Sequence, residues 1–310
     1  MITWGYMKRA GLLILLLAVA FQVAAKPPQY SIKVGVDLVN IVFTVTDRGG
    51  RLVPALTASD FAIEEDGRRQ DILHFSTEDD LPLTLAMVID TSLSVEPVFD
   101  EEKRTAKAFL RSVLRSNDLA LVIGFDRSVW LIQDFTESQR RLSNAIDDLE
   151  LGTGTALYDA VFLAADEKLK REGGRKAIIL ISDGQDNGSK VELTRTLIAV
   201  HQSNTVIYSI SNATEGRYRR FGGFRSDPGT MRRLSEETGG AFFSIERDGD
   251  FKAIFDQIAR ELRSQYTIAY KSSNTAQDGK YRRIKIVPKD PSLTVRARRG
   301  YYAAREVASR

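Results

Sequence analysis

Residues 83–94 read Leu-Thr-Leu-Ala-Met-Val-Ile-Asp-Thr-Ser-Leu-Ser, an apolar run that ends abruptly in acidic and hydroxyl side chains. A short, continuous apolar run is typical of a strand buried on both faces, as in a parallel sheet covered by helices. Similar runs recur with amphipathic helical patterns between them, at 119–125, 177–181, 206–210 and 241–245. We therefore expect an α/β domain with a doubly wound, mostly parallel sheet over residues 81–265.

One connection departs from this alternation. A strand pattern at 129–135 follows the 119–125 run so closely that the two strands must be antiparallel, with Asp126 and Arg127 as the turn. Such a strand belongs at a sheet edge. The expected strand order is 3-2-1-4-5-6, which places the first and fourth strands side by side where the winding reverses, the usual position of a ligand.

Polar side chains gather at the ends of these two strands and before one helix: Asp90, Ser92, Ser94, Thr155 and Asp183. Because the loops that carry them leave the same edge of the sheet, we expect these residues to converge. Carboxylate and hydroxyl oxygens suit a hard divalent cation, and the chain has no cysteine that would favour zinc. Mg²⁺ is the expected ion, with Mn²⁺ and Ca²⁺ as alternatives.

The same residues also have a purely structural interpretation. Ser92, Ser94 and Thr155 precede helical patterns and could cap them, and Asp183-Gly184 could form a turn. The agreement of three separate elements, in order and at the expected strand ends, favours the metal site. With only two carboxylates the ion would keep positive charge, so an exposed Asp or Glu of a protein partner could complete its coordination.

The three elements together resemble the von Willebrand factor A, or integrin I-like, family. Asp90-Thr91-Ser92-Leu93-Ser94 is similar to its D-x-S-x-S element, although Leu93 stands where glycine is common. Thr155 corresponds to its threonine element and Asp183 to its aspartate element. The resemblance covers roughly residues 81–265, and it implies a metal-ion-dependent adhesion site in a bacterial exported protein that binds proteins rather than transforming them.

The flanking segments, 26–80 and 266–305, have short strand patterns separated by polar turns. Neither segment has enough strands to be stable alone. We expect the two to pair into one small β-sandwich, with the metal-binding domain inserted between them.

The first 25 residues have the pattern of a signal peptide, with Lys8 and Arg9 before an apolar run and small residues ahead of Lys26. We expect an exported protein, periplasmic or secreted, with no membrane span after cleavage; an uncleaved anchor is the alternative. The formal charge of +3, with 27% charged residues, gives no indication of nucleic-acid binding.

A second binding element is expected in the loop after the 206–210 run. Guanidinium groups and aromatic rings are interleaved there, in Arg217, Tyr218, Arg219, Arg220 and Phe221. Such side chains could grip an acidic partner beside the metal. A solvated surface loop without a binding role is the alternative.

These patterns predict an exported, metal-dependent protein-binding or adhesion module that is not an enzyme. The first alternative is a structural or assembly scaffold whose metal site is not essential. The second is a metal-assisted hydrolase, which has less support because the chain has no cysteine nucleophile and no histidine near Asp90 or Asp183 in the sequence.

Overall fold

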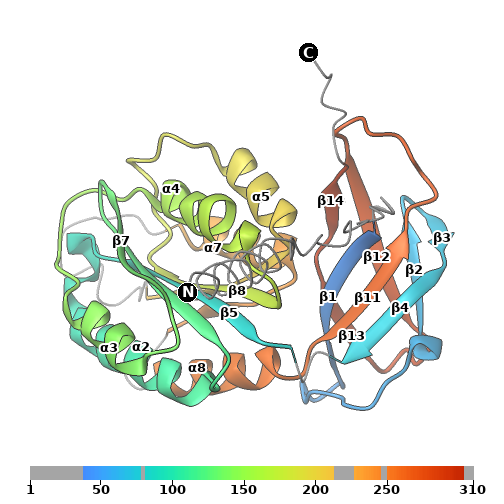
Figure 1. The fold of residues 1–310 in the computed structure, drawn as a ribbon, viewed down its shortest axis with the longest axis horizontal. Coiled ribbons are helices and arrows are strands. Elements are labelled where there is room, and N and C mark those ends of the chain that lie inside the picture. Colours follow the sequence, from blue (N-terminus) through green and yellow to red (C-terminus); the bar gives the residue numbers. More distant parts are fainter. Residues whose placement is uncertain (1–37, 78–80, 213–226, 246–249, 304–310) are drawn as a thin grey trace, which may run out of the picture. The chain divides into compact units, whose positions relative to one another are not determined.

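The computed structural model describes residues 38–77, 81–212, 227–245 and 250–303 (Figure 1). One sheet contains six strands, namely β5 (Leu83–Asp90), β6 (Leu119–Phe125), β7 (Val129–Thr136), β8 (Arg175–Ser182), β9 (Thr205–Ser211) and β10 (Phe242–Ser244). Their order is β10-β9-β8-β5-β6-β7, and neighbouring strands are parallel except β6 and β7. The expected order, with its antiparallel edge strand, is confirmed.

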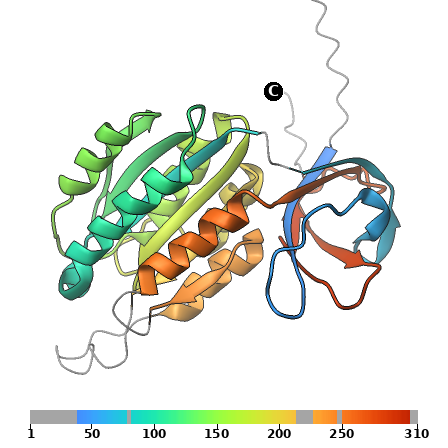
Figure 2. The same ribbon diagram turned by 90° about the horizontal axis from the view of Figure 1, so that it is seen from below.

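Helices cover both faces of this sheet (Figures 1 and 2). One face packs against α2 (Phe99–Val113), α3 (Gln139–Asp147) and α8 (Asp250–Leu262), and the other against α4 (Leu157–Phe162), α5 (Leu193–Gln202) and α7 (Pro228–Thr238). Short helical segments adjoin α2 and α4, at η2 (Leu93–Val98), η3 (Leu163–Lys168) and η4 (Leu169–Arg171).

Strand β5 contributes to both cores. Leu85 and Met87 belong to one buried cluster, whereas Ala86 and Val88 belong to the other. Because successive side chains of a strand point to opposite faces, a strand covered on both sides must be apolar throughout. This explains why Thr84 is the only polar residue in the run at 83–89.

Helix α7 is not among the helices expected from the sequence. Its start is fixed by Asp227, whose Oδ1 accepts a hydrogen bond from Thr230 N at 3.2 Å, and by Pro228 at the first helical position. Gly239 ends the helix with a left-handed φ of 87°. Asp-Pro before a helix and Gly after it are recognisable signals in the sequence.

Eight further strands form two four-stranded antiparallel sheets. The first has the order β13-β1-β11-β4, with β1 (Leu38–Thr46), β4 (Ile72–Thr77), β11 (Tyr266–Lys271) and β13 (Thr294–Ala297). The second has the order β14-β12-β2-β3, with β2 (Phe61–Glu65), β3 (Arg68–Gln70), β12 (Tyr281–Pro288) and β14 (Gly300–Tyr302); the 3-10 helix η1 (Ala58–Asp60) precedes β2.

Both of these sheets combine strands from before and after the α/β domain, and their facing side chains form one core. In that core the ring of Phe43 lies 5.1 Å from Phe61 and 5.5 Å from Tyr266, between centroids. The predicted insertion of the α/β fold into a β-sandwich is confirmed. The domain boundaries at residues 25, 80 and 265 stay predictions.

A buried arginine joins the sandwich to the α/β domain. Arg298 donates hydrogen bonds to Asn40 O at 2.6 Å, Asn204 Oδ1 at 3.2 Å and His201 O at 3.5 Å. Its guanidinium therefore links β1 to the residues between α5 and β9.

The predicted signal peptide lies outside the described residues. Within the described ranges, every helix is too short or too polar to span a membrane.

Candidate metal centre

The two predicted aspartates lie at the ends of neighbouring strands. Strands β5 and β8 pair in parallel register, with Ile89 opposite Ile181, so Asp90 and Ser182 follow side by side at the carboxyl edge of the sheet. Ser182 Oγ donates a hydrogen bond to Asp90 Oδ2 at 2.6 Å, and Asp183 is the next residue. Asp90 and Asp183 are both fully buried, with 0% exposure.

The loop after β5 folds back on Asp90. Ser92 N donates to Asp90 Oδ1 at 2.9 Å, and the hydroxyls of Ser92 and Ser94 lie 2.8 Å apart. Ser92 stands at the N-cap of η2, yet its side chain makes no capping hydrogen bond. The Ser92 hydroxyl therefore does not cap this helix, and the helix-capping interpretation fails for Ser92.

Thr155 lies on a loop that is bonded to both of the others. The loop begins at Gly152, which donates to Thr91 O at 2.7 Å and accepts from Leu93 N at 3.0 Å. Thr155 O in turn accepts from Asn187 N at 3.0 Å and from Gly188 N at 2.9 Å. Thr155 is buried and precedes α4, whose N-cap is Ala156. The three loops therefore meet at one edge.

The electrostatics of this edge favour a cation. Burial, and after it the negative charge of Asp183, raises the pKa of Asp90 to about 7, although hydrogen bonds from Ser182 and Ser92 lower it. The hydrogen bonds that Asp90 accepts from Ser92 and Ser182 come from neutral donors, which offset only part of the loss of solvation. A divalent ion would neutralise both carboxylates, so the donor set fits a hard cation.

Carboxylates alone do not build this site. Within the described ranges no cluster of three or more Asp, Glu, His or Cys side chains has the arrangement of a metal site. Any ion held here would use the two aspartates together with neutral oxygens, as expected for Ser92, Ser94 and Thr155.

Ser182 was not predicted as a site residue. Its hydroxyl contacts Asp90 directly, and it also accepts from Gly184 N at 3.0 Å. Its position just before Asp183 was the available signal. The predicted partner-binding residues Arg217, Tyr218, Arg219, Arg220 and Phe221 lie outside the described residues.

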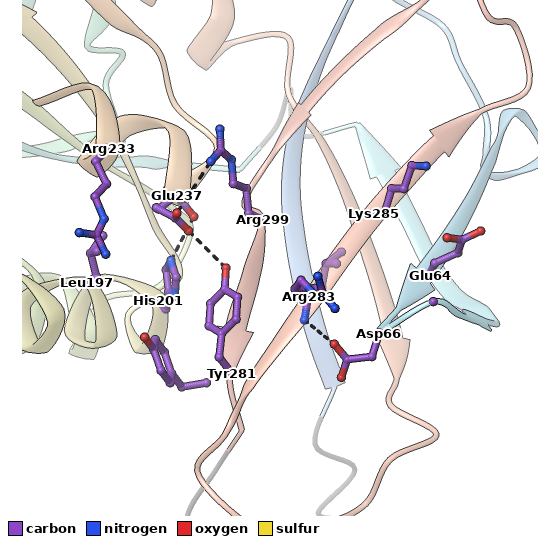
Figure 3. A pocket seen from close by; sticks show the side chains of 13 residues that line it. Glu64, Asp66, Leu197, His201, Arg233, Glu237, Tyr281, Arg283, Lys285 and Arg299 are labelled. Atoms are coloured by element: carbon purple, nitrogen blue, oxygen red, sulfur yellow. Dashed lines mark hydrogen bonds and ion pairs between the residues drawn. The ribbon is translucent and has the colours of Figure 1, made fainter. Parts of the chain in front are cut away.

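A hollow of about 770 Å³ lies between α5 and α7 on one side and β12 and β14 on the other (Figure 3). It lies near the start of β9, away from the carboxyl edge. Tyr281 OH donates to Glu237 Oε2 at 3.2 Å, Arg299 Nη1 lies 3.9 Å from Glu237 Oε1, and His201 Nε2 lies 3.1 Å from Glu237 O. Glu237 thus has partners from both walls, and we assign this hollow no ligand.

Comparison with known proteins gives a family for the part of the chain that carries this site. Residues 85–185 match the family model of the von Willebrand factor type A domain. An uncharacterized protein of Borreliella burgdorferi is 22% identical over 214 residues, which are 62% of this chain and 61% of the relative. The match therefore spans less than two thirds of that relative's length.

Solved structures share the fold at low sequence identity. Proximal thread matrix protein 1 from the mussel byssus has a TM-score of 0.50 and 17% identity, over 73% of this chain and 50% of that one. A von Willebrand factor type A structure from Catenulispora acidiphila has a TM-score of 0.49 and 13% identity, over 79% and 74% of the two chains. From the family match and the six-stranded α/β fold, we conclude that this chain contains a von Willebrand factor type A domain.

Proposed function

We propose that this protein is a metal-dependent protein-binding module rather than an enzyme. Its ligands for one divalent cation, Mg²⁺ first among the candidates, are Asp90, Ser92, Ser94, Thr155 and Asp183. The observation that carries the proposal is the burial of two mutually repelling carboxylates, Asp90 and Asp183, at one strand edge. Buried like charges are unfavourable unless an opposite charge accompanies them.

The proposed partner is a protein with an exposed Asp or Glu. Because only two of the proposed ligands are carboxylates and the rest are neutral oxygens, the ion keeps enough positive charge for a further anionic oxygen to complete its coordination. Although Asp90 and Asp183 are buried, Ser94 is half-buried and its neighbour Leu93 is exposed, so the loop after β5 brings the edge of the site to the surface, where a partner can approach it. The predicted export signal places this binding in the periplasm or outside the cell.

The first experiment measures the cation itself. Isothermal calorimetry of the purified chain with Mg²⁺ should give one binding event, which Asp90→Ala abolishes. Asp100→Ala is the matched control, because Asp100 is an exposed carboxylate on the neighbouring helix α2. Absence of cation binding by the wild-type chain would contradict the proposal.

The second experiment measures partner capture. The immobilised chain is exposed to the native envelope fraction in Mg²⁺ or in EDTA, beside Asp90→Ala. A second portion of that fraction has its carboxylates converted to neutral amides by carbodiimide and methylamine. Capture should require Mg²⁺, Asp90 and unblocked carboxylates together. Capture that persists with Asp90→Ala would support the scaffold alternative.

A further inference from the structure

A third carboxylate lies close to the proposed metal site but outside the predicted ligand set. Glu102 is on the first turn of α2, where Asp100 is exposed, yet Glu102 has 0% exposure. Its Oε1 accepts a hydrogen bond from Asn212 Nδ2, and Asn212 is 4% exposed directly after β9. Two segments 110 residues apart therefore meet in a buried polar pair.

This pair is incompletely satisfied. Among the described residues, neither Glu102 Oε2 nor Asn212 Oδ1 has a hydrogen-bond partner. Both atoms are acceptors when Glu102 is ionised, so what the ionised pair needs is a donor or a positive charge. Buried acceptors without a partner are rare in folded proteins, and each one calls for a specific explanation.

The pair is connected to the metal edge. Asn212 N donates to Ser182 O at 3.3 Å, and Ser182 Oγ donates to Asp90 at 2.6 Å. Burial raises the pKa of Glu102 well above its ordinary value, the hydrogen bond from Asn212 lowers it, and the charges of Asp90 and Asp183 raise it further. Glu102 therefore lies within electrostatic reach of both predicted aspartate ligands.

Helix stabilisation does not account for Glu102. An acidic residue in the first turn of a helix interacts favourably with the helix dipole, and an exposed residue such as Asp100 gains this without losing its hydration. Complete burial with one unpaired oxygen is unfavourable for a carboxylate unless something else compensates it. Direct coordination is also not indicated, because the described residues contain no three-carboxylate metal cluster.

We propose that Glu102, oriented by Asn212, is a third acidic group of the cation site and acts on the cation through water. The inference rests on the proposed function of Asp90 and Asp183 as ligands. Water held by a cation is a strong hydrogen-bond donor, which is what Glu102 Oε2 and Asn212 Oδ1 both need. Such indirect partners orient the ligands and raise the affinity of a site for its ion.

The test is calorimetry of the purified chain with Mn²⁺, which substitutes for Mg²⁺ and usually binds more tightly. Glu102→Gln keeps the shape of the side chain and removes its charge. It should weaken binding by about 10–100-fold while one ion still binds, and Asp100→Asn should leave the affinity unchanged. Wild-type affinity in Glu102→Gln would overturn the proposal. Absence of Mn²⁺ binding by the wild-type chain would instead contradict the proposed function.

Thermal melting provides a second readout that a merely structural role would not move. The rise in melting temperature on adding Mn²⁺ should be smaller for Glu102→Gln than for wild type. Asn212→Ala, which removes the amide that orients Glu102, should also give a smaller rise than wild type. Equal rises in melting temperature in all three proteins would show that the pair serves folding alone. Because melting needs only folded protein at the start, it tests the proposal even if one variant is too unstable for calorimetry.

Discussion

Replacing Asp90 by Asn should have opposite effects on stability with and without a divalent cation. In EDTA at pH 8, a buried ionised carboxylate beside Asp183 destabilises the folded protein, so the neutral amide should stabilise it. In Mg²⁺ the same carboxylate becomes a ligand, and its loss should make the variant the less stable protein.

The magnitude follows from the pKa of Asp90. Burial and the charge of Asp183 raise it from 3.8 to about 7. About three pKa units at 1.36 kcal/mol each correspond to about 4 kcal/mol. The amide accepts fewer hydrogen bonds from Ser182 and Ser92, which offsets about 1–3 kcal/mol of this gain. The expected net stabilisation in EDTA at pH 8 is therefore about 1–3 kcal/mol.

The sign of the effect depends on pH. Because the folded-state pKa is raised, the protonated carboxyl favours folding fully below about pH 4, and this contribution is lost as the pH rises through 7. The advantage of Asp90→Asn over wild type should therefore disappear by pH 4. Asp148→Asn, a change of an exposed carboxylate, should show no such pH dependence.

The assay is urea denaturation in EDTA and in Mg²⁺, at pH 8 and pH 4. Mg²⁺ at a thousand times its Kd should add about 4.1 kcal/mol to the wild type and much less to the variant, which reverses their order. A variant less stable than wild type in EDTA at pH 8 would refute the electrostatic reasoning.

Three further predictions concern the rest of the fold. Arg298→Ala should lower the free energy of unfolding by about 3–5 kcal/mol, because the buried guanidinium that bonds three oxygens of two other segments is lost; Arg299→Ala, which removes exposed ion pairs, should lower it by about 1 kcal/mol or less in the same urea titration. Burial lowers the pKa of His201 to about 4, so the contribution of this residue to stability should fall by about 3 kcal/mol between pH 6.5 and 4 as the unfolded chain takes up the proton first; the stability difference between wild type and His201→Gln should change by that amount over this range, and the difference between wild type and His74→Gln, at an exposed position, should stay constant. Gly240→Ala should destabilise by about 3 kcal/mol or more in thermal melts, since its Cβ would lie 1.8 Å from a β9 carbonyl oxygen.

The strand order could be predicted because the burial of each strand and the length of each connection are visible in the local sequence. Strands buried on both faces must be apolar throughout, which makes 83–89 and 177–181 recognisable. The three residues 126–128 that link β6 to β7 are too few for anything but an antiparallel pair. The insertion into a β-sandwich followed from the instability of each flanking segment alone.

Helix α7 was not predicted because of the sequence that precedes it. Met231 and Leu234 are buried with the right spacing for a helix, between Asp227-Pro228 and Gly239. The residues before them in the sequence are rich in Arg and Gly, so the short apolar stripe alone does not predict a helix.

The sequence by itself determined which residue types could hold a hard cation and placed Asp90 and Asp183 at neighbouring strand ends, because strand ends and motif spacing are local properties. Only the tertiary structure revealed Glu102 and Asn212. Glu102 stands in Asp-Glu-Glu, a composition that fits a solvated helix start equally well. Whether one of those carboxylates is buried depends on what the strand 110 residues later brings against it, and no local pattern records that contact.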